Sequence, residues 1–239
     1  MKIDIHTHVL PGIDDGAKNW ETCLTMLSQS YECGIETVFA TPHYEPWNKT
    51  ATVEEIRTLC KQAKEKLQTE RGITMEIYPG CEIYYNFEVV DKLKRGELAT
   101  LAGSRYVLVE FKPSAQYREL CRAVKEFRDA GYIPIIAHVE RYECLKNLER
   151  MDELKELGAL LQMNLEAIQG NVFHAESNRA KKCLKQGVID FIASDMHSLG
   201  IRSPMKKEKL RWIQAKLSPK YRQKLLCENA QKILSSIKE

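Results

Sequence analysis

The sequence predicts an α/β fold in which about seven strand–helix units close into a barrel of parallel strands. Stretches that suit strands alternate with stretches that suit helices along the whole chain of 239 residues. The strand-like stretches are short apolar runs, which is typical of parallel strands buried on both faces. The length also suits a single-domain α/β barrel. An open doubly wound sheet is the alternative, although the sequence lacks the glycine-rich nucleotide loops common in such sheets.

The strands are predicted from apolar runs that end in a turn or in a polar side chain. In the first of them Ile3 and Ile5 alternate with polar residues, whereas 106–111 and 132–138 are almost continuously apolar. The predicted strands are 2–8, 35–40, 73–78, 106–111, 132–138, 159–164 and 188–193. Their number matches the seven units of the predicted barrel.

Helical periodicity and capping residues place a helix after most strands. Asn19 can cap the first helix and Gly34 ends it, while Gly131 ends the helix before the strand at 132–138. The other predicted helices are 53–70, 91–98, 117–130, 144–157 and 175–186, followed by a basic helical segment after Pro204 that we expect to add little to the fold. No repeat or linker interrupts this order, so residues 1–239 are expected to form a single domain.

The composition argues against several classes of partner. With 36 basic and 33 acidic residues the formal net charge is +3, which gives no reason to expect nucleic acid or an anionic membrane as a partner. No apolar run approaches the roughly 18 residues of a membrane span, and no secretory signal precedes the first strand. The eight cysteines form no C-x-x-C pair, which favours reduced thiols. We therefore expect a cytoplasmic protein without membrane insertion.

Side chains that bind metals follow the ends of the predicted strands. In an α/β barrel the carboxyl ends of the strands meet at one rim, where catalytic residues lie. Five of the six histidines lie at such ends, and only His174 falls elsewhere, in a polar stretch expected at the surface. The predicted donors are His6, His8, His43, Glu82, Glu110, His138, Asp195 and His197. We therefore predict a metal site at this rim, although Glu82 or Glu110 alone could be a capping or salt-bridged acid.

The donor types indicate what kind of metal site this is. Imidazoles and carboxylates without thiolates disfavour a closed structural zinc site, which is typically rich in cysteine. They favour an open site for manganese, iron, zinc or magnesium, and the share of carboxylates favours Mn²⁺. The donors are too many for one ion, so two or three ions are expected. Paired metals about 3.5–4 Å apart are a known solution for hydrolysis of phosphate esters.

Two arginines follow strand ends where a phosphate would need them. Arg141 comes three residues after His138, and Arg202 lies in a loop five residues after His197. A guanidinium group can bind two phosphate oxygens at once, so both are candidate catalytic residues. The alternative for each is a salt bridge to a nearby acid such as Glu140.

An ordered set of motifs resembles the PHP (polymerase and histidinol phosphatase) superfamily from residue 1 to about residue 204. Within it, the chain is similar to the manganese-dependent tyrosine phosphatases of bacterial capsule and exopolysaccharide clusters. The motifs are His6-x-His8, Asp14-Asp15-Gly16, Thr41-Pro42-His43, Glu82-Ile83-Tyr84-Tyr85, Glu110-Phe111, Ala137-His138-x-Glu140-Arg141-Tyr142 and Ser194-Asp195-Met196-His197. His6-x-His8 alone is a weak signal, whereas the complete set is highly specific.

This resemblance implies a distorted (β/α)7 TIM-like barrel with a three-metal centre at the carboxyl-terminal rim of the strands. His6, His8, Glu82 and Asp195 would hold one ion. Glu82 would bridge to a second ion, held also by Glu110 and His138. Asp15, His43 and His197 would hold the third. The family pattern favours Asp15, but the sequence alone leaves Asp14 as an alternative.

The resemblance also implies the substrate, which is phosphotyrosine on the tyrosine-rich tail of a membrane-associated bacterial tyrosine autokinase that controls polysaccharide export. A metal-activated hydroxide would attack phosphorus in line while Arg141 and Arg202 stabilise the charge, without a phosphoenzyme. The leaving tyrosinate has a conjugate-acid pKa near 10, so it needs less protonation than an alkoxide.

Three other functions are alternatives to a metal-dependent tyrosine phosphatase. A cysteine-based tyrosine phosphatase is suggested by a C-x5-R match from Cys144 to Arg150, but the intervening residues contain no glycine and favour a helix. A small-molecule enzyme such as a histidinol-phosphate phosphatase would use the same donors. A metal-stabilised module that binds a polymerase or kinase without catalysis is the third, and the complete donor set argues against it.

Overall fold

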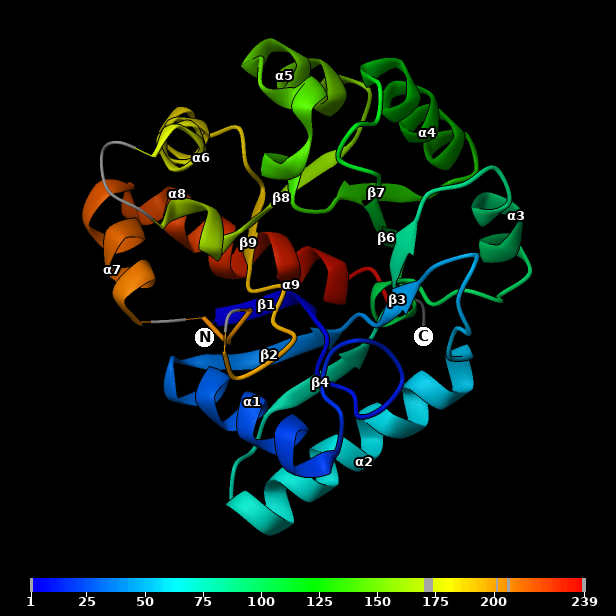
Figure 1. Cartoon of the computed structure of the whole chain (residues 1–239), viewed down its shortest axis with the longest axis vertical. Coiled ribbons are helices and arrows are strands. Elements are labelled where there is room, and N and C mark those ends of the chain that lie inside the picture. Colours follow the sequence, from blue (N-terminus) through cyan, green and yellow to red (C-terminus); the bar gives the residue numbers. More distant parts are fainter. Residues whose placement is uncertain (1, 170–173, 201, 206, 238–239) are drawn as a thin grey trace.

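In the part of the chain that the structure describes, nine short parallel strands run through the middle of the molecule, and helices surround them (Figure 1). The computed structural model describes residues 2–169, 174–200, 202–205 and 207–237. The strands are β1 Lys2–Thr7, β2 Ile35–Ala40, β3 His43–Tyr44, β4 Glu76–Pro79, β5 Glu82–Tyr84, β6 Tyr106–Glu110, β7 Ile133–Ile136, β8 Leu160–Asn164 and β9 Phe191–Ala193. They form a curled parallel sheet, as the sequence predicts for an α/β protein.

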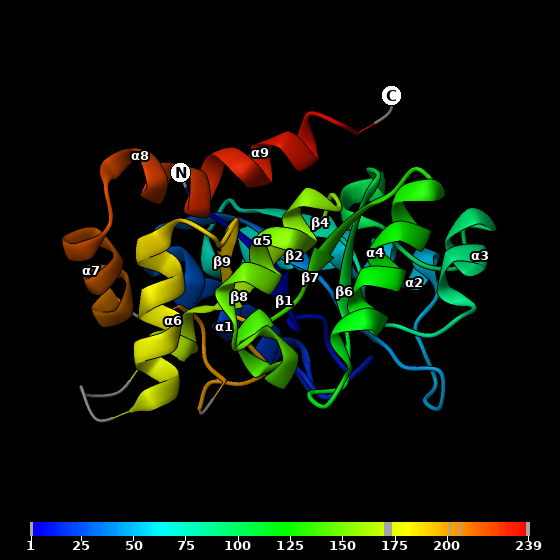
Figure 2. The same cartoon turned by 90° about the horizontal axis from the view of Figure 1, so that it is seen from above.

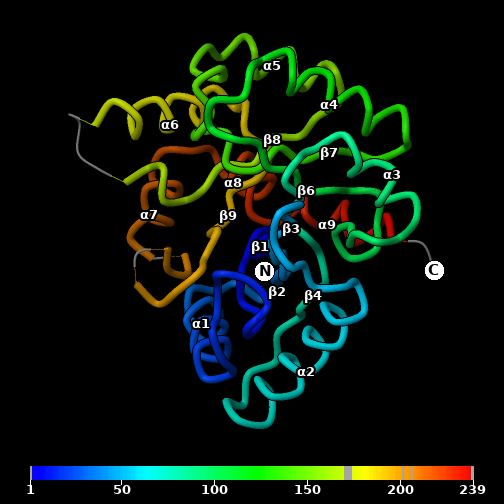
Figure 3. Tube along the Cα trace, turned by 45° about the vertical axis from the view of Figure 1, so that its right-hand side comes forward, coloured from blue at the N-terminus to red at the C-terminus, as the bar shows by residue number. Residues whose placement is uncertain are grey.

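Helices connect the strands and cover the outer face of the sheet (Figures 1 and 3). They are α1 Trp20–Glu32, α2 Val53–Arg71, α3 Val89–Lys94, α4 Tyr117–Asp129, α5 Leu148–Glu156, α6 Ala175–Gln186, α7 Lys207–Lys216, α8 Pro219–Gln223 and α9 Asn229–Leu234. Among the described residues, no helix is long and apolar enough to cross a membrane.

The ladder of hydrogen bonds between neighbouring strands continues across two short breaks. Ala40 of β2 is paired with Pro79 of β4, and His43 of β3 is paired with Glu82 of β5. Both pairs are 39 residues apart, so the register is the same on each side of the break. The strand predicted at 73–78 begins three residues later than expected, as β4 at Glu76. Glu82, which was predicted to follow this strand, is the first residue of a separate strand, β5.

The first and last strands of the sheet also meet. Thr7 of β1 forms a parallel bridge with Met196, and the backbone N–H of Asp195 donates to the carbonyl of His6 at 3.0 Å. The N–H of His8 in turn donates to the carbonyl of Met196 at 2.9 Å. These bonds bring the segment after β9 beside the end of β1, although the two lie almost 190 residues apart in the sequence.

The strands are apolar because both of their faces are buried. Along β6, Val107 and Val109 pack in the outer core under the helices, whereas Tyr106 and Leu108 pack in a second core inside the curl. This alternation follows from the period of two in a strand. The continuous apolar run of this strand is thus explained by two cores rather than one.

Local signals decided most helix ends. The side chain of Asn19 accepts a hydrogen bond from the N–H of Thr22 and caps α1, as predicted. Thr52 and Glu55 form a capping box at the start of α2. The predicted helix at 144–157 is wrong in its first turns, because Asn147 caps α5 and starts the helix at Leu148.

The C-terminal helices lie against the edge of the sheet opposite to the loops that follow the strands (Figure 2). Ala230 and Ile233 of α9 are buried in the inner core together with Ile3, Ile5 and Phe39. The segment after Pro204 therefore closes the bottom of the inner core, a larger role than the sequence indicated.

Candidate metal centre

The end of β1 supplies two imidazoles that point at one place. The Nε2 atoms of His6 and His8 are only 3.1 Å apart, and both residues are buried. The Nδ1 atom of His6 lies 3.2 Å from Oε1 of Gln162, and that of His8 lies 2.7 Å from Oδ2 of Asp14. Because both of these partners are oxygen acceptors, each neutral ring donates from Nδ1 and presents the lone pair of Nε2. Two lone pairs facing each other suit a shared cation.

Glu82 and Asp195 complete a buried group of four donors around this place. Oε2 of Glu82 lies 3.0 Å from Nε2 of His6 and 3.1 Å from Nε2 of His8, and Oδ1 of Asp195 lies 3.4 and 3.5 Å from the same atoms. The ligand atoms of all four lie within 4.8 Å of one another. Oε2 of Glu82 is buried and forms no hydrogen bond within the described part of the chain. This arrangement fits a metal ion.

Glu82 also reaches a second group through its other oxygen. Nε2 of His138 lies 2.8 Å from Oε1 of Glu82 and 3.2 Å from Oε1 of Glu110. Nδ1 of His43 lies 3.1 Å from Oε2 of Glu82 and 3.9 Å from Glu110. The single Glu82 carboxylate thus stands between two sets of donors, as a bridging ligand would.

A third group of donors lies closer to solvent. The Nε2 atoms of His43 and His197 are 3.4 Å apart, and Oδ1 of Asp15 lies 3.4 and 3.2 Å from them. The side chain of Asp15 is 63% exposed, whereas the first group is buried. The ring of His8 stacks on that of His197 at 3.7 Å and joins the groups. The donor array therefore runs from a buried end to an open end, where a substrate can enter.

The loop after β1 separates the roles of the two adjacent aspartates. Asp14 accepts hydrogen bonds from Nδ1 of His8 and from the N–H of Gly16, at 2.7 and 2.9 Å. Asp15 instead faces the histidines of the third group. A Cβ at Gly16 would lie 2.1 Å from the carbonyl oxygen of His8, so only glycine allows the loop to pack this closely. Asp14 therefore orients a ligand, and Asp15 is the candidate ligand.

The electrostatics of the cluster favour added positive charge. Although burial lowers the pKa of His8, the carboxylates of Asp14 and Glu82 raise it to about 10. Burial likewise lowers the pKa of His138, but Glu110 and Glu82 raise it to about 9. Burial alone would raise the pKa of Glu82, yet His6 and His138 hold it well below its ordinary value. The ionised carboxylates thus stabilise the protonated forms of the neighbouring imidazoles, and a metal ion would be stabilised by the same negative charge.

Two of the candidate ligands have strained backbones. His138 has a φ of 32° and Asp195 a φ of 53°, in the left-handed region that residues other than glycine rarely adopt. Each lies two residues after the end of a strand, β7 and β9 respectively, and turns its side chain into the cluster. Such strain persists where the surrounding structure enforces it, which is common at functional sites.

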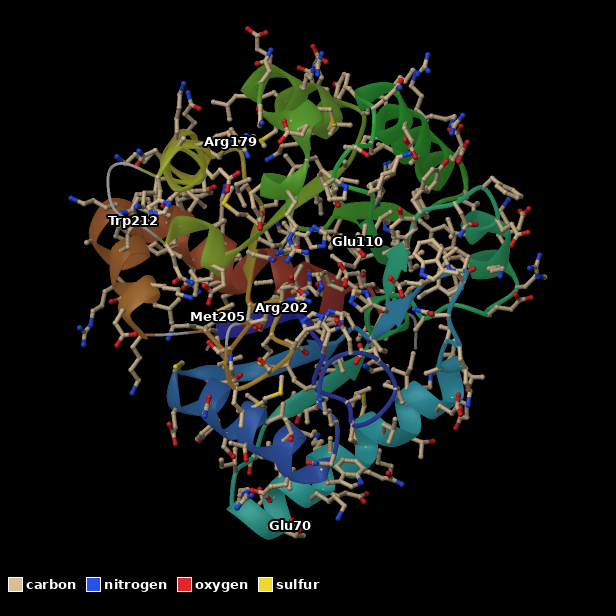
Figure 4. All side chains as sticks on the ribbon, viewed as in Figure 1. Glu70, Glu110, Arg179, Arg202, Met205 and Trp212 are labelled. Atoms are coloured by element: carbon tan, nitrogen blue, oxygen red, sulfur yellow. The ribbon has the colours of Figure 1, made fainter. Side chains whose placement is uncertain are left out.

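The two candidate arginines both bind Asp195. Nη2 of Arg141 donates to Oδ2 at 2.6 Å, and Nη2 of Arg202 donates to Oδ1 at 2.9 Å. Of the two alternatives for these arginines, a salt bridge is thus present, but to Asp195 rather than Glu140. Their side chains remain 37% and 35% exposed, and Nη1 of Arg202 also lies 3.7 Å from Oδ2 of Asp15. Figure 4 places Arg202 and Glu110 near the centre of the molecule, where the strands end.

Two residues that orient the donors, Gln162 and Asn164, were not predicted from the sequence. Oε1 of Gln162 accepts from the N–H of His138 at 2.8 Å as well as from His6, and Nδ2 of Asn164 donates to Oδ2 of Asp195 at 2.7 Å. Gln162 and Asn164 alternate with apolar residues at the end of β8, the same spacing as His6 and His8. Two buried amides at that spacing were a signal that could have found them.

The structure does not support Cys144 as the nucleophile of a cysteine-based tyrosine phosphatase. Cys144 lies in a short turn, Glu143–Leu145, and burial raises the pKa of its thiol. A nucleophilic cysteine needs the opposite shift. All eight cysteines are free thiols, as predicted. His174, the histidine expected outside the site, is exposed before α6.

Comparison with known proteins agrees with these observations. The model of the family described as "Capsular polysaccharide synthesis, CpsB/CapC" matches residues 2–235. The tyrosine-protein phosphatase CpsB of Streptococcus pneumoniae is 33% identical over 97% of this chain and 98% of its own length. The tyrosine-protein phosphatase YwqE of Bacillus subtilis (strain 168) is 30% identical over 97% of this chain and 91% of its own.

A solved structure extends the match to three dimensions. It comes from work on YwqE from Bacillus subtilis and CpsB from Streptococcus pneumoniae, described as unique metal-dependent tyrosine phosphatases. It superposes with a TM-score of 0.88 and 28% identity, and the match covers 99% of this chain and 95% of that one. The family match over almost the whole sequence, together with the relatives and the common fold, leads to one conclusion: the chain belongs to the CpsB/CapC family of capsular polysaccharide synthesis proteins.

Proposed function

We propose that this chain is a metal-dependent protein-tyrosine phosphatase. The observation that carries the proposal is the convergence of nine imidazole and carboxylate side chains from distant strand ends on one cluster, with Glu82 between two of its groups. Relatives that match nearly the whole chain are named tyrosine-protein phosphatases, and the matching structure is described as metal-dependent. Regulation of capsular or exopolysaccharide synthesis is the biological role that follows from the family.

The proposed ligand sets are those that the family resemblance implies, and they draw on the three groups of donors. His6, His8, Glu82 and Asp195 would hold the buried ion, and Glu82, Glu110 and His138 the bridged ion. Asp15, His43 and His197 would hold the ion at the open end. When bound, such ions activate water as a nucleophile near neutral pH and neutralise phosphoryl oxygens. The share of carboxylates makes Mn²⁺ the expected ion, with iron, zinc and magnesium as the alternatives.

The chain's own residues would bind and orient the phosphoryl group. Arg141 and Arg202 are anchored on the two oxygens of Asp195, which limits their rotamers. Because both side chains are partly exposed, we expect the donors that Asp195 does not use to bind phosphoryl oxygens. The tyrosinate that leaves has a conjugate-acid pKa near 10, so expulsion needs little help from a general acid. No side chain has to form a covalent phosphoenzyme.

The proposed substrate is a phosphotyrosine-bearing tail of a membrane-associated bacterial tyrosine kinase, met in the cytoplasm. An open donor group, with Asp15 mostly exposed, suits an extended protein segment better than an enclosed small molecule. Neither nucleic acid nor membrane insertion is part of the proposal.

We also propose that residues 1–239 form one domain built on a seven-stranded barrel. The constant register across the breaks supports counting β2 with β3 and β4 with β5, which leaves seven strands in the order of the chain. The bonds from Thr7 and His8 to the segment after β9 support closure of the seventh strand on the first.

Kinetic comparison of two substrates tests the function. We expect kcat/KM to be higher for a phosphotyrosine peptide than for histidinol phosphate, which would be the substrate if the chain were a histidinol-phosphate phosphatase. Chelation by EDTA should abolish the activity, and alkylation of the thiols should leave it intact. Activity that survives chelation, or a preference for histidinol phosphate, would refute the proposal.

Metal analysis of the purified protein tests the cofactor. We expect two or three equivalents of metal in the parent protein and fewer in His138→Ala, together with loss of phosphatase activity. His174→Ala is the matched control, because that histidine is exposed outside the cluster. Unchanged activity in His138→Ala would instead support the non-catalytic binding module.

A further inference from the structure

An aromatic side chain lies one step outward from the metal cluster. Tyr84 comes two residues after Glu82 on β5, so the two side chains lie on the same face of the strand. Ile83 between them packs into the outer core, which confirms that Glu82 and Tyr84 face the other way. Two residues along a strand span roughly 6.6 Å. Tyr84 therefore stands between the buried carboxylate and solvent.

A second aromatic residue extends this surface. The ring of Trp47 packs edge-on against Tyr84, with centroids 4.7 Å apart and an interplanar angle of 74°. Trp47 is 60% exposed, which is unusual for the largest apolar side chain and marks a surface available for contact. The turn that carries Trp47 also supplies Glu45 and Asn48 to a cavity of about 400 Å³.

That cavity connects the turn with the metal cluster. Besides Glu45 and Asn48, its walls include Asp15 and His43, two of the three donors of the exposed group. Trp47 is the chain neighbour of Asn48, so the Tyr84–Trp47 pair lies beside this cavity at the open end of the cluster. Within the described residues, neither ring forms a hydrogen bond or ion pair with a candidate ligand.

The mouth of the site therefore has two chemically different sides. Arg141 and Arg202 provide positive charge beside Asp195. Tyr84 lies next to Glu110 in the register of β5 and β6, and its ring packs against that of Trp47. Glu45 and Lys49, which carry opposite charges, both line the cavity, and the two rings add an apolar surface beside it. This side therefore suits a neutral apolar group. A phosphoryl group attached to an aromatic ring matches both sides.

We propose that Tyr84 and Trp47 are specificity-determining residues that pack against the aromatic ring of the substrate and favour phosphotyrosine over alkyl phosphates. The inference deepens the proposed function and rests on it. Aromatic pairs prefer edge-on or offset contacts and add binding energy beyond the area that they bury. The preference for an aromatic phosphate should therefore depend on these two rings, while the rate on an alkyl phosphate should not.

Two peptides that differ only at the phosphorylated residue test the inference. With the metal-loaded enzyme, Tyr84→Ala and Trp47→Ala should each lower kcat/KM about tenfold on the phosphotyrosine peptide, chiefly by raising KM. On the matched phosphoserine peptide their rates should stay within twofold of the parent. Tyr84→Phe should keep the parent preference because the ring remains. Tyr31→Ala, which removes an exposed aromatic ring from α1, should change neither rate.

Inhibition by two phosphonates gives a readout that does not depend on turnover of the test ligand. Phenylphosphonate should inhibit the parent at least tenfold more tightly than methylphosphonate, and this ratio should fall towards one in Tyr84→Ala and Trp47→Ala. Equal losses on both peptides, or an unchanged ratio of the two phosphonates, would overturn the inference while the proposed function stands. If the parent does not hydrolyse the phosphotyrosine peptide, the proposed function itself fails.

Discussion

At the scale of single residues, four of the donors are held by neighbours that do not belong to the donor set. Asp14 holds His8, Gln162 holds His6 and the backbone of His138, and Asn164 holds Asp195. Such partners set the tautomer and direction of a ligand, and their loss typically costs 10–100-fold in metal affinity or activity. The cluster is therefore larger than the set of atoms that would touch metal.

Gln162 offers a direct test, because its one oxygen serves two donors. Gln162→Ala should weaken metal binding by about 10–100-fold, since His6 loses its Nδ1 acceptor and the N–H of His138 is left without one. Titration of the metal-free protein in competition with a chelator measures the change. Gln186→Ala, at the exposed end of α6, is the control and should bind as the parent does. Equal affinities for Gln162→Ala and the parent would contradict the orienting role.

At the scale of elements, the contact between β1 and the segment after β9 contains a buried acid. Oδ1 of Asp4 accepts from the N–H groups of Ser194 and His6, at 3.1 and 3.4 Å. Its Oδ2 has no hydrogen-bond partner in the described part of the chain. Burial raises the pKa of Asp4 from 3.8 to about 6. The contact thus joins two strands but contains a carboxyl group that resists ionisation.

The pKa of Asp4 predicts how stability changes with pH. Between about pH 4 and pH 6 the folded protein binds more protons at Asp4 than the unfolded chain does, so its free energy of unfolding falls as pH rises. The full loss, up to about 3 kcal/mol, is present at pH 7. Asp4→Asn cannot ionise, so its free energy of unfolding should fall less over this interval.

Urea unfolding of the metal-free proteins at pH 4.5 and pH 7 measures this difference between Asp4→Asn and the parent. Removing the metal keeps competition between protons and ions out of the comparison. Asp152→Asn, on the exposed side of α5, should follow the parent at both pH values. Parallel pH profiles of Asp4→Asn and the parent would show that Asp4 does not carry the effect.

Helix α9 gives a second prediction at this scale. Ile233 is fully buried in the inner core, so Ile233→Ala should lower the free energy of unfolding by about 2–5 kcal/mol through lost burial and the cavity that remains. Denaturant unfolding measures it. Gln231→Ala, on the exposed side of the same helix, should stay within about 0.5 kcal/mol of the parent. A loss below 1 kcal/mol for Ile233→Ala would mean that α9 does not seal the core.

At the scale of the whole molecule, the donors lie in or just after six different strands, so metal binding should stabilise the entire fold. A metal that binds only the folded state at 100 times its Kd adds about 2.7 kcal/mol to the free energy of unfolding. Thermal unfolding should therefore occur at a higher temperature with metal than with EDTA.

Thermal unfolding of two histidine variants, with metal and with EDTA, distinguishes metal binding at the cluster from metal binding elsewhere on the protein. His138→Ala should lose most of the stabilisation by metal, because it removes a donor beside Glu82 and Glu110. His174→Ala should keep it. Identical melting temperatures for the metal-loaded and chelated parent would contradict the metal centre as a whole.

Short-range patterns in the sequence predicted much of the fold. The bounds of β2 and α6 agree with the prediction residue for residue, and those of α2 within one residue, because apolar periodicity and caps such as Asn19 act over a few neighbouring positions. The sheet is parallel and curled, as the alternation of strands and helices indicates. The donor side chains at the strand ends were likewise visible in the order of motifs, because parallel strands bring their carboxyl ends to one rim.

Only the tertiary structure decided what depends on distances between remote parts of the chain. Asp14 and Asp15 differ in their contacts, because one carboxylate reaches His8 and the other faces His197, a difference that adjacent residues do not reveal in sequence. The pairing of Arg141 with Asp195, 54 positions away, replaces the expected neighbour for the same reason. The roles of Gln162 and of α9 also depend on the curled sheet, which brings them next to the donors and to the inner core. Local sequence determines which residues can be buried or can bind a ligand, and the tertiary fold determines which residues they contact.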